Sequence, residues 1–265
     1  MVMPDKLPIW QLWLGRPSVA SRACEQTVEN VYSGYAYHRL TGKQLPTRIR
    51  NLIGKVGHAA VSDVFRAWAL WKHGGVWLDS DIIAQREIPF RTMLAERPNA
   101  IITANHSPAD AEWASSGIMA AGTGHPVMKQ AYEESIAMLE QHGRTLDYLA
   151  AGPALVTRLL RKHKDQWIIL DNHQYAHKYS NSVLQRRYRW PFARERDTDS
   201  RDWYYAHVLG ACLKKHRELT MPALMRYGTV FSHLLRTTYE AIFFPPLYTG
   251  LHASYLIRSP STGFE

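Results

Sequence analysis

The sequence predicts an α/β protein with a parallel sheet layer, and three observations support that prediction. The chain opens with a strand, a helix and a second strand in succession over residues 9–40. A helix, two glycines and a very short buried strand follow over residues 59–78, and this strand ends in acidic residues. Alternating strands and helices are typical of parallel sheets with helices on their faces. With 265 residues and 46% hydrophobic side chains, the chain can bury such a core.

The first elements follow from hydrophobic spacing and turn residues. Residues 9–14 are mostly apolar or aromatic and end at a Gly-Arg-Pro turn, which indicates a buried strand. Ser18 suits the N-cap of a helix that continues to about Tyr32, because apolar residues recur at near-helical spacing. Residues 35–40 are the second predicted strand, and residues 51–56 are expected to be helical.

The next helix has the clearest pattern. From about Ala59 its apolar residues recur on one side, and it ends before the Gly-Gly pair at 74–75, since glycine accepts the backbone conformation that ends a helix. Residues 76–78 are a short strand, and the Asp-Ser-Asp triplet at 79–81 follows it directly. Ligand sites of open α/β sheets favour this place, at the carboxyl ends of strands.

The rest of the chain divides into a main domain and an appendage. Further strands are predicted over residues 100–103, 116–121 and 167–170, and further helices over residues 126–141 and 152–163. After Met221 the composition changes to an amphipathic helix followed by an aromatic stretch. We therefore expect one domain over residues 1–220 and a C-terminal helical and aromatic appendage over residues 221–265.

Composition and charge limit the class of protein. The two cysteines lie far apart and match no zinc-ligand spacing, which favours reduced thiols in the cytoplasm. The N-terminus lacks the pattern of a signal peptide, and no apolar run has the length that spans a bilayer, so a soluble or peripheral protein is expected. A net charge of +9 favours anionic partners, which include phosphate-bearing substrates, nucleic acid and acidic membrane surfaces.

Asp79 and Asp81 form the candidate metal site. Carboxylates two residues apart point to opposite faces of a strand, yet at a strand exit they can converge because the backbone turns between them. Hard oxygen ligands suit Mg²⁺ or Mn²⁺, ions that typically bridge the phosphates of a nucleotide. On the preceding helix Asp63 and Arg66 are three residues apart and share one face. They either hold a polar ligand or form a surface ion pair.

The run SDVFRAWALWKHGGVWLDSD, residues 62–81, resembles the motif of the DXD-containing glycosyltransferases. That group includes fungal outer-chain mannosyltransferases, glucosylating toxins and bacterial capsular polysaccharide synthesis proteins, and Trp77 is similar to the capsular type. IWQLWLG, SSGIMAAGTGHP and AGPALVTRLL also match, so the resemblance covers about residues 9–214. It implies a GT-A-like fold, a Rossmann-type mixed sheet flanked by helices. It also implies retaining transfer of a sugar from a UDP- or GDP-sugar to a saccharide or lipid-linked acceptor, without nucleic acid as a partner.

The resemblance also implies a role for each matching residue of the donor site. Trp13 resembles the aromatic residue that stacks on the nucleotide base, and Trp77 the aromatic residue beside the donor. For both tryptophans a position in the core is the alternative. Asp63 and Arg66 resemble the pair that holds hydroxyl groups of the donor sugar.

At the metal, the resemblance separates the two aspartates. Asp81 would ligate the Mn²⁺ or Mg²⁺ ion directly, while Asp79 would contact the ribose or the sugar and a metal-bound water. Ser116 and Gly117 stand where relatives approach the transferred sugar. No residue identifies itself as a covalent nucleophile, so transfer on the front face of the sugar is expected.

The third ligand of the metal and diphosphate is expected to be His207, and His252 is its rival. Relatives follow their histidine with Ser-Trp, whereas this chain has Cys212-Leu213 at that place. Lys214 or Lys215 would neutralise the leaving phosphate, or would simply be solvated.

Two other classes remain as alternatives. A metal-dependent phosphohydrolase or nuclease also fits an acidic pair on a basic protein, and its further carboxylates would be Glu87, Asp110 or Glu112. A nucleic-acid-binding protein is suggested by the pI and by the aromatic and basic residues at 186–201, but it would leave the spacing of the acidic motif unexplained.

Overall fold

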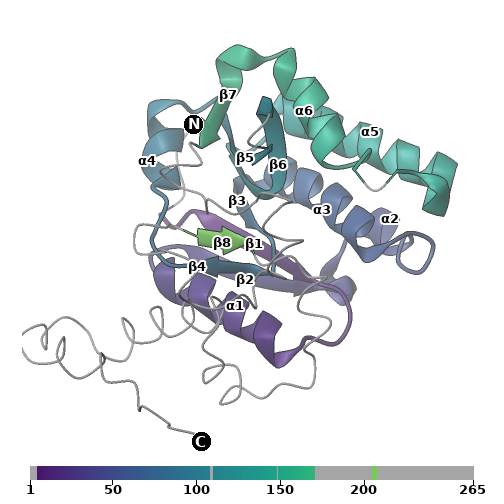
Figure 1. The fold of residues 1–265 in the computed structure, drawn as a ribbon, viewed down its shortest axis with the longest axis horizontal. Coiled ribbons are helices and arrows are strands. Elements are labelled where there is room, and N and C mark those ends of the chain that lie inside the picture. The colour runs from purple at the N-terminus through teal and green to yellow at the C-terminus, as the bar shows by residue number, and fades with distance from the viewer. Residues whose placement is uncertain (1–4, 108–109, 148, 171–204, 208–265) are drawn as a thin grey trace, which may run out of the picture.

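The computed structural model describes residues 5–107, 110–147, 149–170 and 205–207. Six strands form one sheet: β1 (Pro8–Trp13), β2 (Ala36–Thr41), β3 (Gly75–Leu78), β5 (Ile101–Ser107), β6 (Asp110–Ala121) and β7 (Trp167–Leu170). Their order is β2-β1-β3-β6-β5-β7 (Figure 1). Strand β6 runs antiparallel to both neighbours, while β1 is parallel to β2 and β3, and β5 to β7. The predicted mixed α/β sheet is confirmed.

Helices cover both faces of this sheet (Figure 1). They are α1 (Val19–Val31), α2 (Thr47–Arg50), α3 (His58–His73), α4 (Phe90–Glu96), α5 (Pro126–His142) and α6 (Pro153–Arg161), with short 3-10 turns at Gly42–Gln44, Gly143–Thr145 and Lys164–Gln166. One hydrophobic cluster receives Val28 from α1 and Phe90 from α4. The other receives Phe65 from α3, Met128 from α5 and Leu159 from α6. The sheet is therefore the middle layer between two cores.

Several predicted elements are confirmed with their boundaries. Ser18 is the N-cap of α1, and its side chain accepts a hydrogen bond from the backbone N–H of Ser21 at 3.2 Å. The parallel pairing of β1 with β2 confirms the expected strand, helix and strand at the start of the chain. Strand β7 has the predicted bounds, and α5 ends one residue later than predicted.

The prediction of a helix over residues 51–56 is wrong. The helix in this region is the four-residue α2, and residues 51–56 form turns with an isolated bridge between Ile53 and Val56. Gly54 has a φ of +84°, a backbone conformation that a right-handed helix does not contain.

Three short elements are absent from the sequence-based prediction. Helix α4 lies between β4 (Ile82–Ala84) and β5, and β4 pairs antiparallel with β8 (Tyr205–His207) in a separate two-stranded sheet. Strands of three residues are too short to show an alternating pattern, and only their pairing partner defines them.

The expected appendage, residues 221–265, lies outside the described residues, as do Lys214, Lys215 and His252. Among the helices of the described residues, none combines the length and apolar character that crossing a bilayer requires.

The Gly-Gly pair connects α3 to β3 as predicted. Gly74 is the C-cap with a φ of +64°, and its N–H donates to the carbonyl of Leu70 at 3.0 Å. Gly75 has a φ of +99°, and a Cβ atom there would lie 2.3 Å from the carbonyl oxygen of Pro8 in β1. The second glycine thus lets β3 begin directly beside β1.

We predict that Gly75→Ala lowers the free energy of unfolding by about 3 kcal/mol, because strain at positive φ adds to overlap with Pro8. Gly54→Ala is the control, since its φ is also positive but a Cβ there meets nothing within 4 Å. It is expected to cost about 1 kcal/mol. Urea unfolding followed by circular dichroism measures both. Equal losses in the two variants would contradict the role of close packing at Gly75.

Candidate active site

The predicted site residues gather where β1 and β3 end beside β6. Trp13 is the last residue of β1, and Asp79 follows the last residue of β3. The backbone N–H of Asp79 donates to the carbonyl of Gly117 in β6 at 2.9 Å. Because β1 and β3 are parallel, their carboxyl ends lie at the same edge of the sheet. The pairing of three strands thus joins residues separated by more than a hundred positions.

The Asp-Ser-Asp segment is a tight turn between β3 and β4. The carbonyl of Asp79 accepts the backbone N–H of Ile82 at 3.1 Å, which closes the turn. The side chain of Asp79 is 23% exposed, and Ser80 and Asp81 are also partly exposed. The carboxylates therefore stand at the border between the buried sheet and solvent.

Arg66 joins two carboxylates at this edge. Its Nη1 donates to Oδ1 of Asp63 at 2.7 Å, and its Nη2 donates to Oδ1 of Asp79 at 2.8 Å. Nε1 of Trp77 donates to the same oxygen of Asp79 at 2.8 Å, and the guanidinium carbon of Arg66 lies 5.0 Å from the Trp77 ring centroid. The side chain of Arg66 is only 5% exposed. The Asp63–Arg66 pair is thus a buried pair, and its alternative as a surface ion pair is wrong.

Asp63 carries a charge in an unfavourable place. Burial, with the nearby charge of Asp79 adding to it, raises the pKa of Asp63 to about 6, although Arg66 and a hydrogen bond with Ser116 oppose the shift. The Asp63 carboxylate lies between the Arg66 guanidinium and the Ser116 hydroxyl group. Such a carboxylate can accept hydrogen bonds from hydroxyl groups of a ligand and orient them. The predicted residues Asp63, Arg66, Asp79 and Ser116 therefore form one polar cluster.

Gly152 is part of this cluster, although the sequence analysis did not select it. It precedes α6, and a Cβ atom at this position would lie 2.4 Å from Cγ and Oδ2 of Asp63. Only a residue without a side chain leaves room for the carboxylate here. The motif AGPALVTRLL contains this glycine, so the family resemblance already included it. The sequence did not show that Gly152 lies next to Asp63 on α3.

The two tryptophans differ in their surroundings. Trp77 is 1% exposed and also packs edge-on against Phe65, with 6.0 Å between ring centroids. Its ring thus lies in the core, and its indole N–H holds Asp79. Trp13 is partly exposed, and its buried Nε1 finds no hydrogen-bond partner in the described part of the chain.

Asp81 influences a thiol group of helix α1. Burial, and after it the charge of Asp81, raises the pKa of the Cys24 thiol in α1 well above its ordinary value. His207 lies in β8 directly opposite Ile82, the residue that follows Asp81. The backbone thus brings the predicted third ligand next to the acidic turn, while its rival His252 lies outside the described residues.

The chemistry of this turn fits a hard divalent cation. Asp79 and Asp81 offer carboxylate oxygens, the ligands that Mg²⁺ and Mn²⁺ prefer, and such ions keep several positions for water and phosphate oxygens. Within the described residues, no group of three or more His, Cys, Asp or Glu side chains is arranged to hold a metal.

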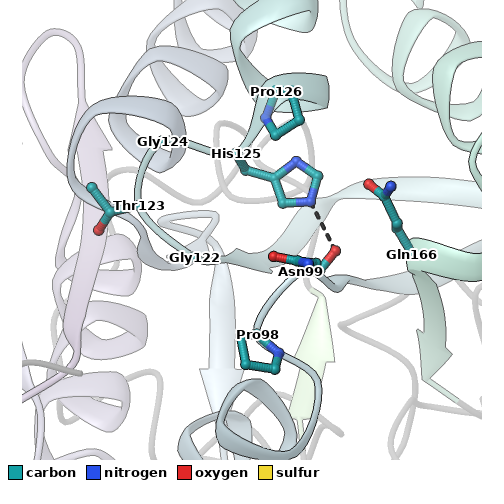
Figure 2. Close-up of a pocket in the computed structure, with 8 residues that line it drawn as sticks. All are labelled: Pro98, Asn99, Gly122, Thr123, Gly124, His125, Pro126 and Gln166. Atoms are coloured by element: carbon teal, nitrogen blue, oxygen red, sulfur yellow. Dashed lines mark hydrogen bonds between the residues drawn. The ribbon is translucent and has the colours of Figure 1, made fainter. Parts of the chain in front are cut away.

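A cavity of about 230 Å³ lies elsewhere, where β6 ends and α5 begins (Figure 2). It is lined by Pro98, Asn99, Gly122, Thr123, Gly124, His125, Pro126 and Gln166. The His125 ring caps α5, because its Nδ1 accepts the N–H of Val127 and its Nε2 lies 3.0 Å from the carbonyl of Asn99. Both ring nitrogens are thus occupied, and none of the predicted site residues lines this cavity.

The fold and the acidic cluster define an α/β protein with a polar site at the carboxyl edge of its sheet. Residues 3–218 match the capsular polysaccharide synthesis protein family, so the chain belongs to that family. The predicted resemblance is confirmed.

Individual relatives are more distant. The chain is 29% identical to human alpha-1,4-N-acetylglucosaminyltransferase over 100 residues, which cover 38% of this chain and only a quarter (25%) of that protein. Among solved structures, a glycosyltransferase involved in glycosylation of the major capsid of PBCV-1 is similar with a TM-score of 0.48 and 13% identity, over 81% of this chain and 100% of that one. The glycosyltransferase GlyE of Streptococcus pneumoniae has the same TM-score and identity, over 90% of this chain and 63% of that one.

We predict a pH dependence of stability that comes from Asp63. Its pKa in the folded protein is raised to about 6, so the protonated form favours folding. This stabilisation is complete below about pH 4, the pKa of an aspartate in the unfolded chain. As the pH rises to about 6, the free energy of unfolding falls by roughly 3 kcal/mol. Asp63→Asn removes it. Urea unfolding of both proteins between pH 4 and 7 should show the wild type losing stability relative to the variant. Parallel curves would contradict the assignment.

Proposed function

We propose that the chain is a metal-dependent glycosyltransferase that moves a sugar from a UDP- or GDP-sugar to a saccharide or lipid-linked acceptor. The observation that carries the proposal is the buried Arg66 between Asp63 and Asp79, next to a turn that presents a second carboxylate. Membership of the capsular polysaccharide synthesis family supports it. The human relative is an alpha-1,4-N-acetylglucosaminyltransferase, which is consistent with the proposal.

The cluster around Arg66 suits recognition of a sugar. A fixed guanidinium and two carboxylates offer donors and acceptors in a defined arrangement, which is what discrimination between hydroxyl groups requires. Trp77 holds Asp79 through its indole N–H, and Gly152 leaves space for Asp63. We assign Asp63, Arg66 and Ser116 to the donor sugar. Trp13, partly exposed at the end of β1, is assigned to the nucleotide base.

The acidic turn is assigned to the diphosphate end of the donor. Asp81 and Asp79, with His207 beside them on β8, would hold a Mn²⁺ or Mg²⁺ ion, which supplies positive charge for the departing diphosphate. Arg66 orients the sugar so that the acceptor hydroxyl group meets the anomeric carbon in one position. Asp63 is bonded to Arg66 and to Ser116, so it is assigned to orientation. Retaining transfer on the front face of the sugar is proposed from the family resemblance, since no residue is assigned as a covalent nucleophile.

Of the three carboxylates considered for a phosphohydrolase, Glu87, Asp110 and Glu112, the first and the last are bound to other groups. Glu87 accepts the hydroxyl group of Tyr35 at 3.0 Å, and Glu112 pairs with Lys164 at 2.5 Å. Neither therefore serves the acidic turn, which favours sugar transfer over hydrolysis of phosphate esters. The saccharide or lipid-linked acceptor belongs to this proposal as well. For the expected appendage, residues 221–265, packing on the catalytic domain and peripheral contact with a membrane are the two alternatives.

A thermal-shift screen of UDP- and GDP-sugars, with and without Mn²⁺, tests the donor. A ligand that binds the folded state raises the unfolding temperature, and the correct donor should do so only when Mn²⁺ is present. No shift with any nucleotide sugar, together with binding of DNA that weakens with salt, would favour the nucleic-acid-binding alternative.

We predict that Asp81→Asn abolishes Mn²⁺-dependent turnover of the donor, by a factor of about 100 or more, since it removes a charged ligand of the cation. The control is Asp165→Asn, because Asp165 is exposed and its carboxylate takes no part in the cluster. Release of the nucleoside diphosphate measures both. Metal-dependent turnover at the wild-type rate in Asp81→Asn would contradict its assignment.

We also predict that Gly152→Ala lowers kcat by about tenfold while Mn²⁺ affinity is kept, because the added Cβ displaces Asp63 and leaves the acidic turn in place. Gly57→Ala is the matched control, since a Cβ at Gly57 meets nothing within 4 Å. Steady-state kinetics and calorimetry with Mn²⁺ separate the two effects. An unchanged kcat in Gly152→Ala would contradict the assignment of Asp63 to the donor site.

A further inference from the structure

A buried amide contacts the acidic turn from the neighbouring strand. Gln11 lies in the middle of β1 and is 1% exposed. Its Nε2 donates to the carbonyl oxygen of Asp79 at 3.0 Å, across 68 positions of the sequence. A buried amide group is costly unless its donors and acceptors are used. The hydrogen bond to Asp79 therefore satisfies an amide group whose burial would otherwise be costly.

The carbonyl oxygen of Asp79 has two donors. Gln11 is one, and the backbone N–H of Ile82 at 3.1 Å, which closes the Asp-Ser-Asp turn, is the other. On the opposite side of the residue, the N–H of Asp79 is bound to Gly117. Both peptide groups of Asp79 are thus tied, and the orientation of the 79–80 peptide decides where Ser80 and Asp81 stand.

Tyr37 fixes which way the amide of Gln11 points. Its hydroxyl group donates to Oε1 of Gln11 at 2.7 Å, which leaves Nε2 to face Asp79. Burial raises the pKa of Tyr37 well above its ordinary value, so the phenol keeps its proton and remains a donor. Strands β2, β1 and β3 are adjacent in the sheet, so the chain of hydrogen bonds runs from its edge to the acidic turn.

We infer that Gln11, oriented by Tyr37, positions the 79–81 turn so that Asp81 is held ready to bind the divalent cation. Gln11 and Tyr37 are positioning residues in this assignment, since they act through the backbone of Asp79 and touch no substrate. The inference rests on the proposed function for the role of the cation. The position of the turn itself is a property of the protein alone and is measurable without metal.

The variants Gln11→Met and Tyr37→Phe test the inference, because each keeps the shape of the side chain and removes its hydrogen bond. Tyr35→Phe is the matched control: it also removes a partly buried tyrosine hydroxyl group, but the partner of that group is Glu87 and not the turn. Thermal unfolding confirms that each variant folds. If Gln11→Met does not fold, Tyr37→Phe, which removes one hydroxyl group, carries the test.

The first measurement is hydrogen exchange of the protein without metal, followed by mass spectrometry. Peptides that cover residues 78–83 should exchange faster by roughly fivefold in Gln11→Met and Tyr37→Phe, as loss of one hydrogen bond predicts. Peptides of α5 should be unchanged in both, and Tyr35→Phe should leave residues 78–83 unchanged. Unchanged exchange at 78–83, or an equal rise in α5, would overturn the inference whatever the activity of the protein.

The second measurement is Mn²⁺ affinity by calorimetry with the metal alone. Each variant should bind Mn²⁺ about fivefold more weakly, and the double variant no more weakly than Gln11→Met, because Tyr37 acts through Gln11. Wild-type affinity in both single variants, or additive losses in the double variant, would overturn the inference. A third outcome is that the wild type does not bind Mn²⁺ while hydrogen exchange at residues 78–83 changes as expected. That result would overturn the proposed metal-dependent function but would leave the positioning of the turn by Gln11 in place.

Discussion

The site depends on one guanidinium group that neutralises two carboxylates inside the protein. Asp63 and Asp79 would repel each other at the border of the core, and Arg66 lies between them with one hydrogen bond to each. Because the group is planar and always charged, it fixes both the spacing and the direction of its partners. Removal of one member would leave a buried charge without compensation, which is far more costly than loss of a surface pair. This cluster ties α3 to the end of β3.

The residues around this cluster give Asp63 space and hold Asp79 in one position. Gly152 admits the Asp63 carboxylate, and Trp77 uses its indole N–H to hold Asp79 while its ring stays in the core. These contacts come from the residue before α6 and from β3, and both elements are otherwise parts of the hydrophobic layers. Stability and site geometry are therefore served by the same residues, and a change in the core is expected to reach the site through them.

The two aspartates of the acidic turn have different surroundings. Asp79 faces Arg66 on α3, whereas the charge of Asp81 acts on Cys24 in α1. The proposed function gives them separate roles, contact with the sugar or ribose for Asp79 and binding of the cation for Asp81. A turn with these duties must be held firmly, and the hydrogen bond from Gln11 provides a restraint from outside the turn.

Local features of the sequence determined much of the fold and selected the residues that the structure brings together around Arg66. Ser18, the Gly-Gly pair at 74–75 and the hydrophobic spacing of α1, α3 and α5 act within one or two turns of chain, so they are readable without neighbours. Only the tertiary structure decided the burial of the Asp63–Arg66 pair, the space at Gly152 and the hydrogen bond from Gln11, because each depends on segments far apart in the chain meeting across the β1, β3 and β6 strands.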